Sequence, residues 1–392
     1  MKKSRKLLCM LLALVMVVSL LPVMAFAADE DIAAEEVVPA SVEEISPETA
    51  GIITDVFAKL PNYLVVVKTP WGMLAKGAQV VLYNQNSNTI VASEIATYGV
   101  AVFTKDQRLK AYTMSATWTQ KETGLTFKSA PRISVGKTLD MDVITVHPTF
   151  RIGLKDTDHN AYISGYPDGL VRPNNTLTRA EAAQIIFELM TDESKAQYAK
   201  KTGKTFIDVG KDHWAYEAIT MMTKASVLVG VGDGRFDPDA VMTREQFATM
   251  IAQLFMIEIN QPIGGFIFKD LNGGFADKYI SFLYMLGILE GKGDNMFGPK
   301  DSLTRAQAIP VVNKLIGRLP GEGTTSFGAV ADQMKTWPDN MDTTARYYAA
   351  IQEATNSHDY TLDVNFNTFG DLKGDIFQNI KHPVTERWTL IR

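Results

Sequence analysis

The sequence predicts a multidomain α + β protein, in which an N-terminal antiparallel β-sandwich precedes an α-helical domain of pseudo-three-fold repeats. Its 392 residues suggest more than one domain. Hydrophobicity alternates along residues 60–147, as it does in half-buried strands. A single sequence pattern occurs three times between residues 165 and 316, which predicts repeated structural units.

The N-terminus has the features of an export signal. A basic start precedes an apolar run over residues 7–24, and Ala25-Phe26-Ala27 matches an A-x-A cleavage site. We therefore predict a signal peptide over residues 1–27. A retained membrane anchor is the alternative, and Pro22 fits it less well. No other segment is long and apolar enough to span a bilayer, so we expect no transmembrane helix after cleavage.

Charge and cysteine content exclude several classes of function. The formal net charge is −5, and removal of the four cations of the signal would take it to −9. Such an acidic chain is a poor nucleic-acid binder, because phosphates reward clustered Lys and Arg. Cys9 is the only cysteine and lies in the signal, so we expect no disulfide and no cysteine metal site.

An acidic stretch over residues 28–50 predicts a disordered leader, and residues 51–148 predict the sandwich. The expected strands are rich in β-branched and aromatic residues and cover 64–67, 79–83, 100–103, 112–118 and 139–143. The run from Gly77 through Gly99 and Phe103 to Tyr112 resembles carboxypeptidase-regulatory or prealbumin-like sandwiches.

The repeat consists of a glycine-rich turn followed by a helix start. Its three copies cover residues 165–181, 230–246 and 291–307, and the leading glycine precedes a Thr-Arg pair by the same spacing each time. We expect repeat units at 149–201 (a second half only), 202–262 and 263–320, with residues 321–392 as a C-terminal segment that completes the bundle. An apolar helical stretch follows each Thr-Arg pair.

Two sets of side chains recur at each helix start. Thr-x-x-Glu or Thr-x-x-Gln is a capping box, in which each side chain accepts from the backbone N–H of the other residue. We assign this structural role to six residues: Thr178, Glu181, Thr243, Gln246, Thr304 and Gln307.

The arginine of each pair, Arg179, Arg244 or Arg305, takes the first helical position, where a cation opposes the helix dipole at a cost of about 0.3–1 kcal/mol. The residues alone leave two interpretations open. One is a structural ion pair with the aspartate of the preceding loop. The other is an anion site, where the guanidinium and free helix N–H groups converge on a carboxylate or phosphate.

These motifs closely resemble the S-layer homology domain, whose hallmark is a Gly-x-x-Asp-Gly loop before an Ile/Leu-Thr-Arg-Ala-Glu helix start. Residues 177–181 match that helix start in full, and residues 242–246 and 303–307 match it less completely. The family's Phe-x-Asp and His-Trp-Ala-x-x-Ala-Ile half occurs at 206–208 and 213–219, and more weakly at 268–280.

The resemblance implies a three-fold prism of helix-loop-helix repeats that binds secondary cell-wall polysaccharide noncovalently, through a pyruvylated terminal sugar. It implies that the motif arginine, Arg179 above all, meets the ketal carboxylate. It also implies export to the cell wall or S-layer of a Gram-positive-type bacterium, with other surface-layer proteins as further partners and no cofactor. The expected ligand-binding residues are Arg179, Arg244, Arg305, Asp168, Gly169, Asp233, Gly234, Asp294 and Trp214.

The order of the half-motifs indicates a circular permutation. The first Thr-Arg segment has no helical half before it, whereas Trp337-Pro338-Asp339 and residues 346–351 repeat that half near the C-terminus. We expect the helix over residues 347–354 to pack beside the Arg179 helix and close the ring. Residues 356–392 predict only a strand-like or irregular cap.

Other chemistry finds little support in the sequence. The five histidines, His147, His159, His213, His358 and His382, have no metal-site spacing, so we expect no metal site. Asp156-Thr157-Asp158 and Asp237-Pro238-Asp239 lack the EF-hand pattern, and no credible catalytic triad occurs. We therefore expect a non-enzymatic protein. A surface polysaccharide hydrolase and an envelope assembly scaffold are the alternatives.

Overall fold

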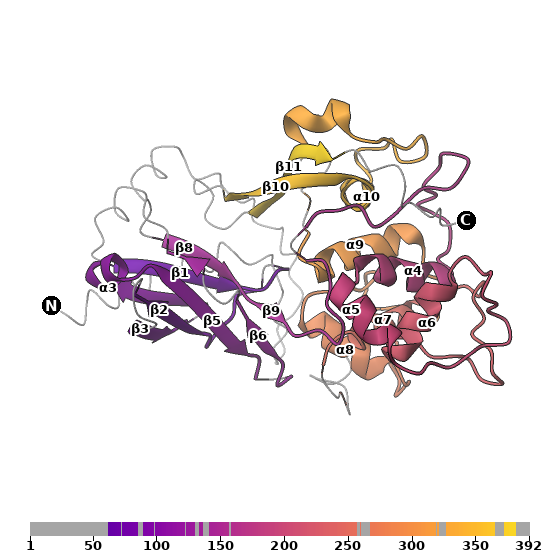
Figure 1. Ribbon diagram of the computed structural model, residues 1–392, viewed down its shortest axis with the longest axis horizontal. Coiled ribbons are helices and arrows are strands. Elements are labelled where there is room, and N and C mark those ends of the chain that lie inside the picture. Colours follow the sequence, from indigo (N-terminus) through magenta and orange to yellow (C-terminus); the bar gives the residue numbers. More distant parts are fainter. Residues whose placement is uncertain are drawn as a thin grey trace, which may run out of the picture.

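The computed structural model describes residues 62–381, apart from 72, 85–88, 98, 122, 130–132, 136–140, 157, 257–258, 260–266, 319, 321–326 and 365–371. The predicted signal peptide and acidic leader lie outside the described residues. The described N-terminal part is built of strands and the C-terminal part mostly of helices, and Figure 1 shows the two parts side by side. The predicted multidomain α + β architecture is confirmed.

The N-terminal part is a β-sandwich of two sheets. One sheet has the order β4-β1-β8 and the other the order β3-β2-β5-β6-β9, with β7 paired to β5. The strands are β1 (Asn62–Lys68), β2 (Gln79–Tyr83), β3 (Ile90–Ile95), β4 (Val100–Thr104), β5 (Thr113–Thr119), β6 (Thr126–Lys128), β7 (Ile133–Ser134), β8 (Met141–Thr145) and β9 (His147–Pro148). All pairs are antiparallel except β1–β8, which is parallel.

Alternating residues of these strands form the core of the sandwich. In β2, Val80 and Leu82 are fully buried, whereas their neighbours face outward. On β5 and β6, Trp118 and Phe127 pack with ring centroids 4.8 Å apart. Because successive side chains of a strand point to opposite faces, the alternation read from the sequence places these residues between the sheets.

A short helix, α3 (Lys105–Lys110), follows β4 and was not expected from the sequence. Thr104 and Gln107 form a capping box at its start, with the Gln107 side chain accepting from Thr104 N–H at 2.7 Å. The Thr-x-x-Gln signal was therefore present, but the surrounding strand pattern obscured it.

The C-terminal part contains the helices predicted after each Thr-Arg pair. Its elements are α4 (Arg179–Leu189), α5 (Asp192–Ala199), α6 (Tyr216–Lys224), α7 (Arg244–Ala252), α8 (Asp277–Met285), α9 (Arg305–Leu315), the 3₁₀ helix η1 (Gly328–Gln333), α10 (Tyr348–Thr355), β10 (Ser357–Val364) and β11 (Leu372–Lys381). β10 and β11 pair as an antiparallel hairpin.

The helices pair around a ring, α6 against α4, α8 against α7 and α10 against α9. The predicted position of the C-terminal helix beside the Arg179 helix is therefore wrong, because α10 packs chiefly on the Arg305 helix, α9. The reason is the order of the ring. The first helix of each unit packs against the Thr-Arg helix of the unit before it, and α9 carries the last Thr-Arg pair of the chain.

Three buried residues form a closed triangle of backbone hydrogen bonds at the centre of this ring. Leu177 N–H donates to Leu303 O at 2.8 Å, Leu303 N–H to Met242 O at 2.9 Å, and Met242 N–H to Leu177 O at 2.9 Å. Each residue directly precedes a Thr-Arg pair. The triangle marks a pseudo-three-fold axis that is sealed from water by the three side chains.

The C-terminal segment packs on the first repeat in the same way that the Phe-x-Asp half-motif packs on the second and third repeats. A Cβ added to Gly165 would lie 2.0 Å from Trp337, and one added to Gly230 would lie 2.6 Å from Phe206. The third repeat repeats this fit, with Gly291 2.6 Å from Phe268 by the same measure. These glycines are required because a ring lies directly over each Cα.

The two parts of the molecule also touch. An added Cβ on Gly317, after α9, would lie 2.8 Å from Pro70, and one on Gly287, after α8, would lie 3.9 Å from Trp71. Among the described residues, no helix has the length and apolar character needed to cross a membrane.

Candidate functional site

The Thr-Arg helices begin with the capping geometry that their sequence predicts. Thr178 Oγ accepts from Glu181 N–H at 3.2 Å, and the Glu181 carboxylate accepts from Thr178 N–H at 2.8 Å. Thr243 and Gln246 make the same pair of bonds, at 3.3 and 3.0 Å. In the third helix, the Gln307 side chain accepts from Thr304 N–H at 3.2 Å.

The next two N–H groups of each helix donate to carbonyls of another repeat. Arg179 N–H donates to Ala240 O at 3.0 Å and Ala180 N–H to Pro238 O at 2.9 Å. The equivalent bonds run from Arg244 to Asp301, from Glu245 to Pro299, from Arg305 to Asn175 and from Ala306 to Pro173. The idea that free helix N–H groups receive an anion here is therefore wrong, because these groups already have acceptors.

The three motif arginines connect the repeats in a cycle. Arg179 donates from Nε to Phe236 O at 2.9 Å and from Nη2 to Val229 O at 2.7 Å, both in the second repeat. Arg244 donates in the same way to Phe297 O of the third repeat at 2.8 Å. Arg305 closes the cycle by donating to Val171 O of the first repeat at 3.0 Å.

An aromatic ring lies under each guanidinium. The distances from Cζ to the ring centroid are 4.5 Å for Arg179 over Phe236 and 4.4 Å for Arg244 over Phe297. Burial lowers the pKa of both arginines, although nearby aspartates counteract this in part. Arginine remains a cation in proteins, so each motif contributes a fixed positive charge between two repeats.

Neither interpretation of the arginine foresaw this arrangement. Asp168 of the first loop pairs with Arg172 at 2.7 Å, and no ion pair joins it to Arg179 in the described part of the chain. The carbonyl bonds explain why a cation recurs where the helix dipole disfavours it. Charge-assisted bonds to carbonyls of the next repeat outweigh a dipole cost of about 0.3–1 kcal/mol.

Aspartates of the Phe-x-Asp half-motif hold the loops that receive the arginines. Asp208 accepts from Phe236 N–H and Asp237 N–H at 2.9 and 2.8 Å. Asp270 accepts from Phe297 N–H and Gly298 N–H at 2.9 and 2.6 Å. In the first repeat this acceptor is Asp339, which comes from the C-terminal segment and binds the N–H groups of Val171 and Arg172.

The three arginine sites differ in access. Arg305 is fully buried, lies 5.1 Å from the centroid of the Tyr166 ring, and has Glu181 Oε1 3.7 Å from its Nη1. Tyr166 donates to Glu181 and so closes this site, and burial raises the pKa of Tyr166 to about 12. Arg179 is 6% exposed, whereas Arg244 is only partly buried.

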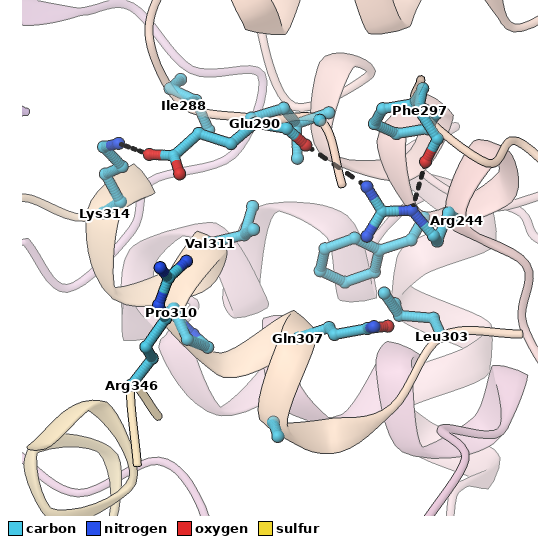
Figure 2. A pocket seen from close by; sticks show the side chains of 14 residues that line it. Arg244, Ile288, Glu290, Phe297, Leu303, Gln307, Pro310, Val311, Lys314 and Arg346 are labelled. Atoms are coloured by element: carbon cyan, nitrogen blue, oxygen red, sulfur yellow. Dashed lines mark hydrogen bonds and ion pairs between the residues drawn. The ribbon is translucent and has the colours of Figure 1, made fainter. Parts of the chain in front are cut away.

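Arg244 opens onto a cavity of about 300 Å³ between the second and third repeats. Figure 2 shows Arg244 on one side, Lys314 on the other, and Arg346 beside Pro310. The apolar walls of the cavity include Phe247, Ile288, Phe297, Leu303, Pro310 and Val311. Glu290 is the one acid in this lining, and it pairs with Lys314 at 3.2 Å, so three cations face one anion.

The predicted loop residues lie at turns and do not line this cavity. Gly169 and Gly234 have φ values of 81° and 70°, which favour glycine, and Asp233 and Asp294 adopt φ values of 48° and 50°. Trp214 begins the segment leading into α6, where its ring stacks on His213 with centroids 5.7 Å apart.

Sequence reasoning missed Lys314, Glu290 and Arg346 as members of a site. Lys314 lies in the last turn of α9, and Glu290 directly precedes the glycine turn of the third repeat. Arg346 comes from the C-terminal segment. The repeat alignment had marked Arg346 as a helix-start residue. It gave no sign that this side chain reaches another repeat.

Comparison with known proteins identifies the class of this helical part. A family model of the S-layer homology domain matches residues 158–183, 205–248 and 267–309. These segments contain the arginine cycle and its receiving loops. The chain thus carries S-layer homology repeats, and the matched segments stop short of residue 339, which supplies the third Phe-x-Asp aspartate.

Three relatives show the range of proteins that share this region. The chain is 34% identical over 215 residues to a cellulosome-anchoring protein of Acetivibrio thermocellus, which covers 53% of this chain and 45% of the relative. It is 30% identical over 128 residues to the S-layer protein sap of Bacillus anthracis, covering 32% and 16%. It is 37% identical over 116 residues to endo-1,4-beta-xylanase A of Thermoanaerobacterium saccharolyticum, covering 29% and 10%.

The chain spans less than half the length of each of these relatives. The S-layer homology segments and the surface-layer and anchoring relatives support a location at the cell wall.

Proposed function

We propose that this chain is a non-catalytic anchor that binds a pyruvylated secondary cell-wall polysaccharide noncovalently, in the cavity at Arg244. The β-sandwich is the part that the anchor displays, and other surface-layer proteins are its further partners. The single observation that carries the proposal is the concentration of Arg244, Lys314 and Arg346 around one apolar cavity between two repeats.

The chemistry of the cavity suits a sugar that carries a carboxylate. Guanidinium groups form strong charge-assisted hydrogen bonds to carboxylates, and apolar walls favour the hydrophobic face of a sugar ring and a ketal methyl group. A cavity of about 300 Å³ lies at the lower end of ordinary ligand sites, which supports recognition of a terminal residue rather than a long stretch of polymer.

The comparison among the three arginines supports Arg244 over Arg179, which the family resemblance had favoured. Arg305 lies beneath Tyr166 and Glu181, and Arg179 donates to two carbonyls at 2.7–2.9 Å. Arg244 makes a weaker second bond, with Nη2 3.3 Å from Glu290 O. Its guanidinium can therefore turn toward a ligand at a lower energetic cost.

The relatives support a binding role rather than a catalytic one. The shared region occurs in a cellulosome-anchoring protein, in an S-layer protein and in a xylanase, and it covers only 10% of that xylanase. A segment common to proteins with such different names is better explained as an attachment module than as an active site.

A sedimentation assay with purified Gram-positive wall sacculi tests the proposal. We expect the chain to bind sacculi and to lose binding when acid extraction removes the secondary polysaccharide. Arg346→Ala should weaken binding at least about tenfold, since a charge-assisted hydrogen bond contributes about 1.5–3 kcal/mol. Within the described residues, Arg346 forms no hydrogen bond or ion pair, so this change should leave the fold intact.

Lys211→Gln is the matched control, because Lys211 is exposed and lies outside the cavity lining. A hexose bearing a pyruvate ketal should compete for binding, and the same hexose without the ketal should not. Equal binding of Arg346→Ala and Lys211→Gln would show that the cavity is not the site. Equal binding to intact and extracted sacculi would show that the polysaccharide is not the ligand.

A further inference from the structure

A buried polar cluster lies where the two ends of the permuted repeat region meet. In the second repeat, Met222 O accepts from the N–H groups of Val227 and Leu228, which continue the same chain. In the first repeat, the matching bonds run from Tyr162 and Ile163 to Ala354 O, across the break in the chain.

This equivalence places Glu353 at the position of Met221, which precedes Met222. Met221 is a buried apolar residue, as is Phe282 at the same position of the third repeat. Glu353 is fully buried as well. A carboxylate is costly to bury without strong partners, so its presence at a position occupied elsewhere by apolar side chains requires an explanation.

Two histidines from distant segments meet this carboxylate. His159 Nδ1 lies 3.0 Å from Glu353 Oε1, and His358 Nε2 lies 3.2 Å from Glu353 Oε2. The two ring nitrogens are 3.0 Å apart, although the residues are separated by 199 positions. The side chains are at most 1% exposed, so water does not screen the three groups from one another.

The hydrogen bonds around His358 fix how its ring is presented. His358 Nδ1 lies 3.0 Å from the backbone oxygen of Asn356. A carbonyl can only accept, so Nδ1 carries a proton, and Nε2 faces the Glu353 carboxylate. Metal-binding histidines commonly show this arrangement, in which the second ring nitrogen donates to a carbonyl.

One possible ligand atom from each of the three side chains lies within 4.8 Å of the other two. No backbone, hydroxyl or amide donor in the described part of the chain reaches either oxygen of Glu353. Glu353 Oε2 and His358 Nε2 lie 3.2 Å apart, and His159 Nδ1 completes a set of three possible ligand atoms from three segments of the chain.

We propose that His159, Glu353 and His358 bind a divalent transition-metal ion, Zn²⁺ in the first place, as a structural clasp. Zinc binds imidazole nitrogen and carboxylate oxygen at about 2.0–2.2 Å, and tetrahedral geometry then separates its ligand atoms by about 3.3 Å. The observed separations of 3.0–3.2 Å are close to this value. Two histidines and one glutamate are a known zinc ligand set, in which a water molecule takes the fourth position.

Arg318 sets a limit on the affinity of the site. Its Nη1 lies 3.9 Å from Glu353 Oε1, and it donates to the carbonyls of Asp158 and Asn160 at 2.6 and 2.8 Å. It therefore lies beside the cluster without entering it. Its positive charge opposes a bound cation, so we expect weaker binding than at a structural zinc site without such a neighbour.

A bound ion would join three separate parts of the fold: the start of the first repeat, α10 and the start of β10. In the second repeat the equivalent segments follow one another along the chain, whereas here they come from its two ends. The proposal departs from the prediction of no metal site. That prediction rested on histidine spacing, and no spacing rule links residues 199 positions apart.

The test measures metal in the intact chain. We expect the purified protein to retain about one equivalent of zinc by mass spectrometry of its metal content. Adding zinc to the chelator-treated protein should raise its melting temperature by about 5 °C or more, because a ligand that binds only the folded state stabilises it. Cobalt(II) should give the visible absorption of a tetrahedral nitrogen- and oxygen-ligated ion.

Glu353→Gln, which keeps the volume of the side chain, and His358→Ala should abolish all three signals. His213→Ala, in another repeat, should retain them. If a variant does not fold, the zinc and chelator comparison on the unaltered chain decides alone. Metal content at the level of the buffer blank, with no change in melting temperature on adding zinc, would overturn the proposal. Unchanged zinc binding by His358→Ala would do the same.

Discussion

At the scale of single residues, the motif arginine has a structural role that its position in the helix conceals. Arg179 is 6% exposed, and its donors satisfy two carbonyls of the next repeat. Its guanidinium also lies over the Phe236 ring. Arg244 differs from Arg179, because its second hydrogen bond is weaker and its guanidinium is accessible from the adjoining cavity.

Arg179→Met should destabilise the protein by about 2–4 kcal/mol, because it leaves the oxygens of Val229 and Phe236 without their donors. Chemical denaturation followed by circular dichroism measures this change. Arg235→Gln is the control. Arg235 is more than half exposed and pairs with Asp237, so its loss should cost less than about 1 kcal/mol. Equal stability of the two variants would contradict the structural role.

At the scale of elements, the loops between helices depend on one carboxylate each. Burial alone would raise the pKa of Asp208, but the N–H groups of Phe236 and Asp237 outweigh it and lower the pKa. The pKa of Asp270 is lowered in the same way, by the backbone N–H groups of Phe297 and Gly298. The motif arginine of the preceding repeat donates to a carbonyl of the same loop. The aspartate and the arginine therefore fix the position of the loop together.

The lowered pKa values predict acid sensitivity with a definite sign. The unfolded chain binds the protons more readily, so these aspartates stabilise the fold above the ordinary aspartate pKa of about 3.9. That stabilisation is lost as the pH falls below this value and through the lowered pKa of the folded state. Melting temperatures between pH 6 and pH 3 measure it, and Asp208→Asn should give a flatter curve in the acid range. If the melting temperatures of the unaltered chain and of Asp208→Asn fell equally with pH, Asp208 would not be a source of the acid sensitivity.

At the scale of the whole molecule, the helical part is a ring closed by its own C-terminal segment. Asp339 receives the N–H groups of Val171 and Arg172, and Trp337 covers Gly165. The C-terminal segment also supplies Arg346 to the cavity at Arg244, on a different repeat. Ring closure and the proposed binding site therefore depend on the same stretch of chain.

A double-mutant cycle measures this closure. Gly165→Ala alone should destabilise the protein by about 1–3 kcal/mol, because the added methyl group overlaps the buried Trp337 ring. In a Trp337→Leu background the same change should cost clearly less, giving a coupling energy of about 0.5–3 kcal/mol. Additive effects of the two substitutions would show that the segment does not pack on the first repeat.

The sequence by itself determined the features that are local in the chain. Alternation predicted the strands of the sandwich, and the Thr-x-x-Glu and Thr-x-x-Gln pairs predicted where the three helices begin, because both depend on neighbours within a few residues. The fixed spacing of the glycine turns predicted three equivalent repeats. The half-motif at Trp337 predicted that the C-terminal segment belongs with the first of them.

Only the tertiary structure decided which groups meet across the ring. It placed α10 on α9 rather than on α4, turned the arginines toward carbonyls, and opened a cavity at Arg244. It also brought His159 to His358. These contacts arise from the packing of segments far apart in the sequence, and neither spacing nor local pattern carries information about such distances.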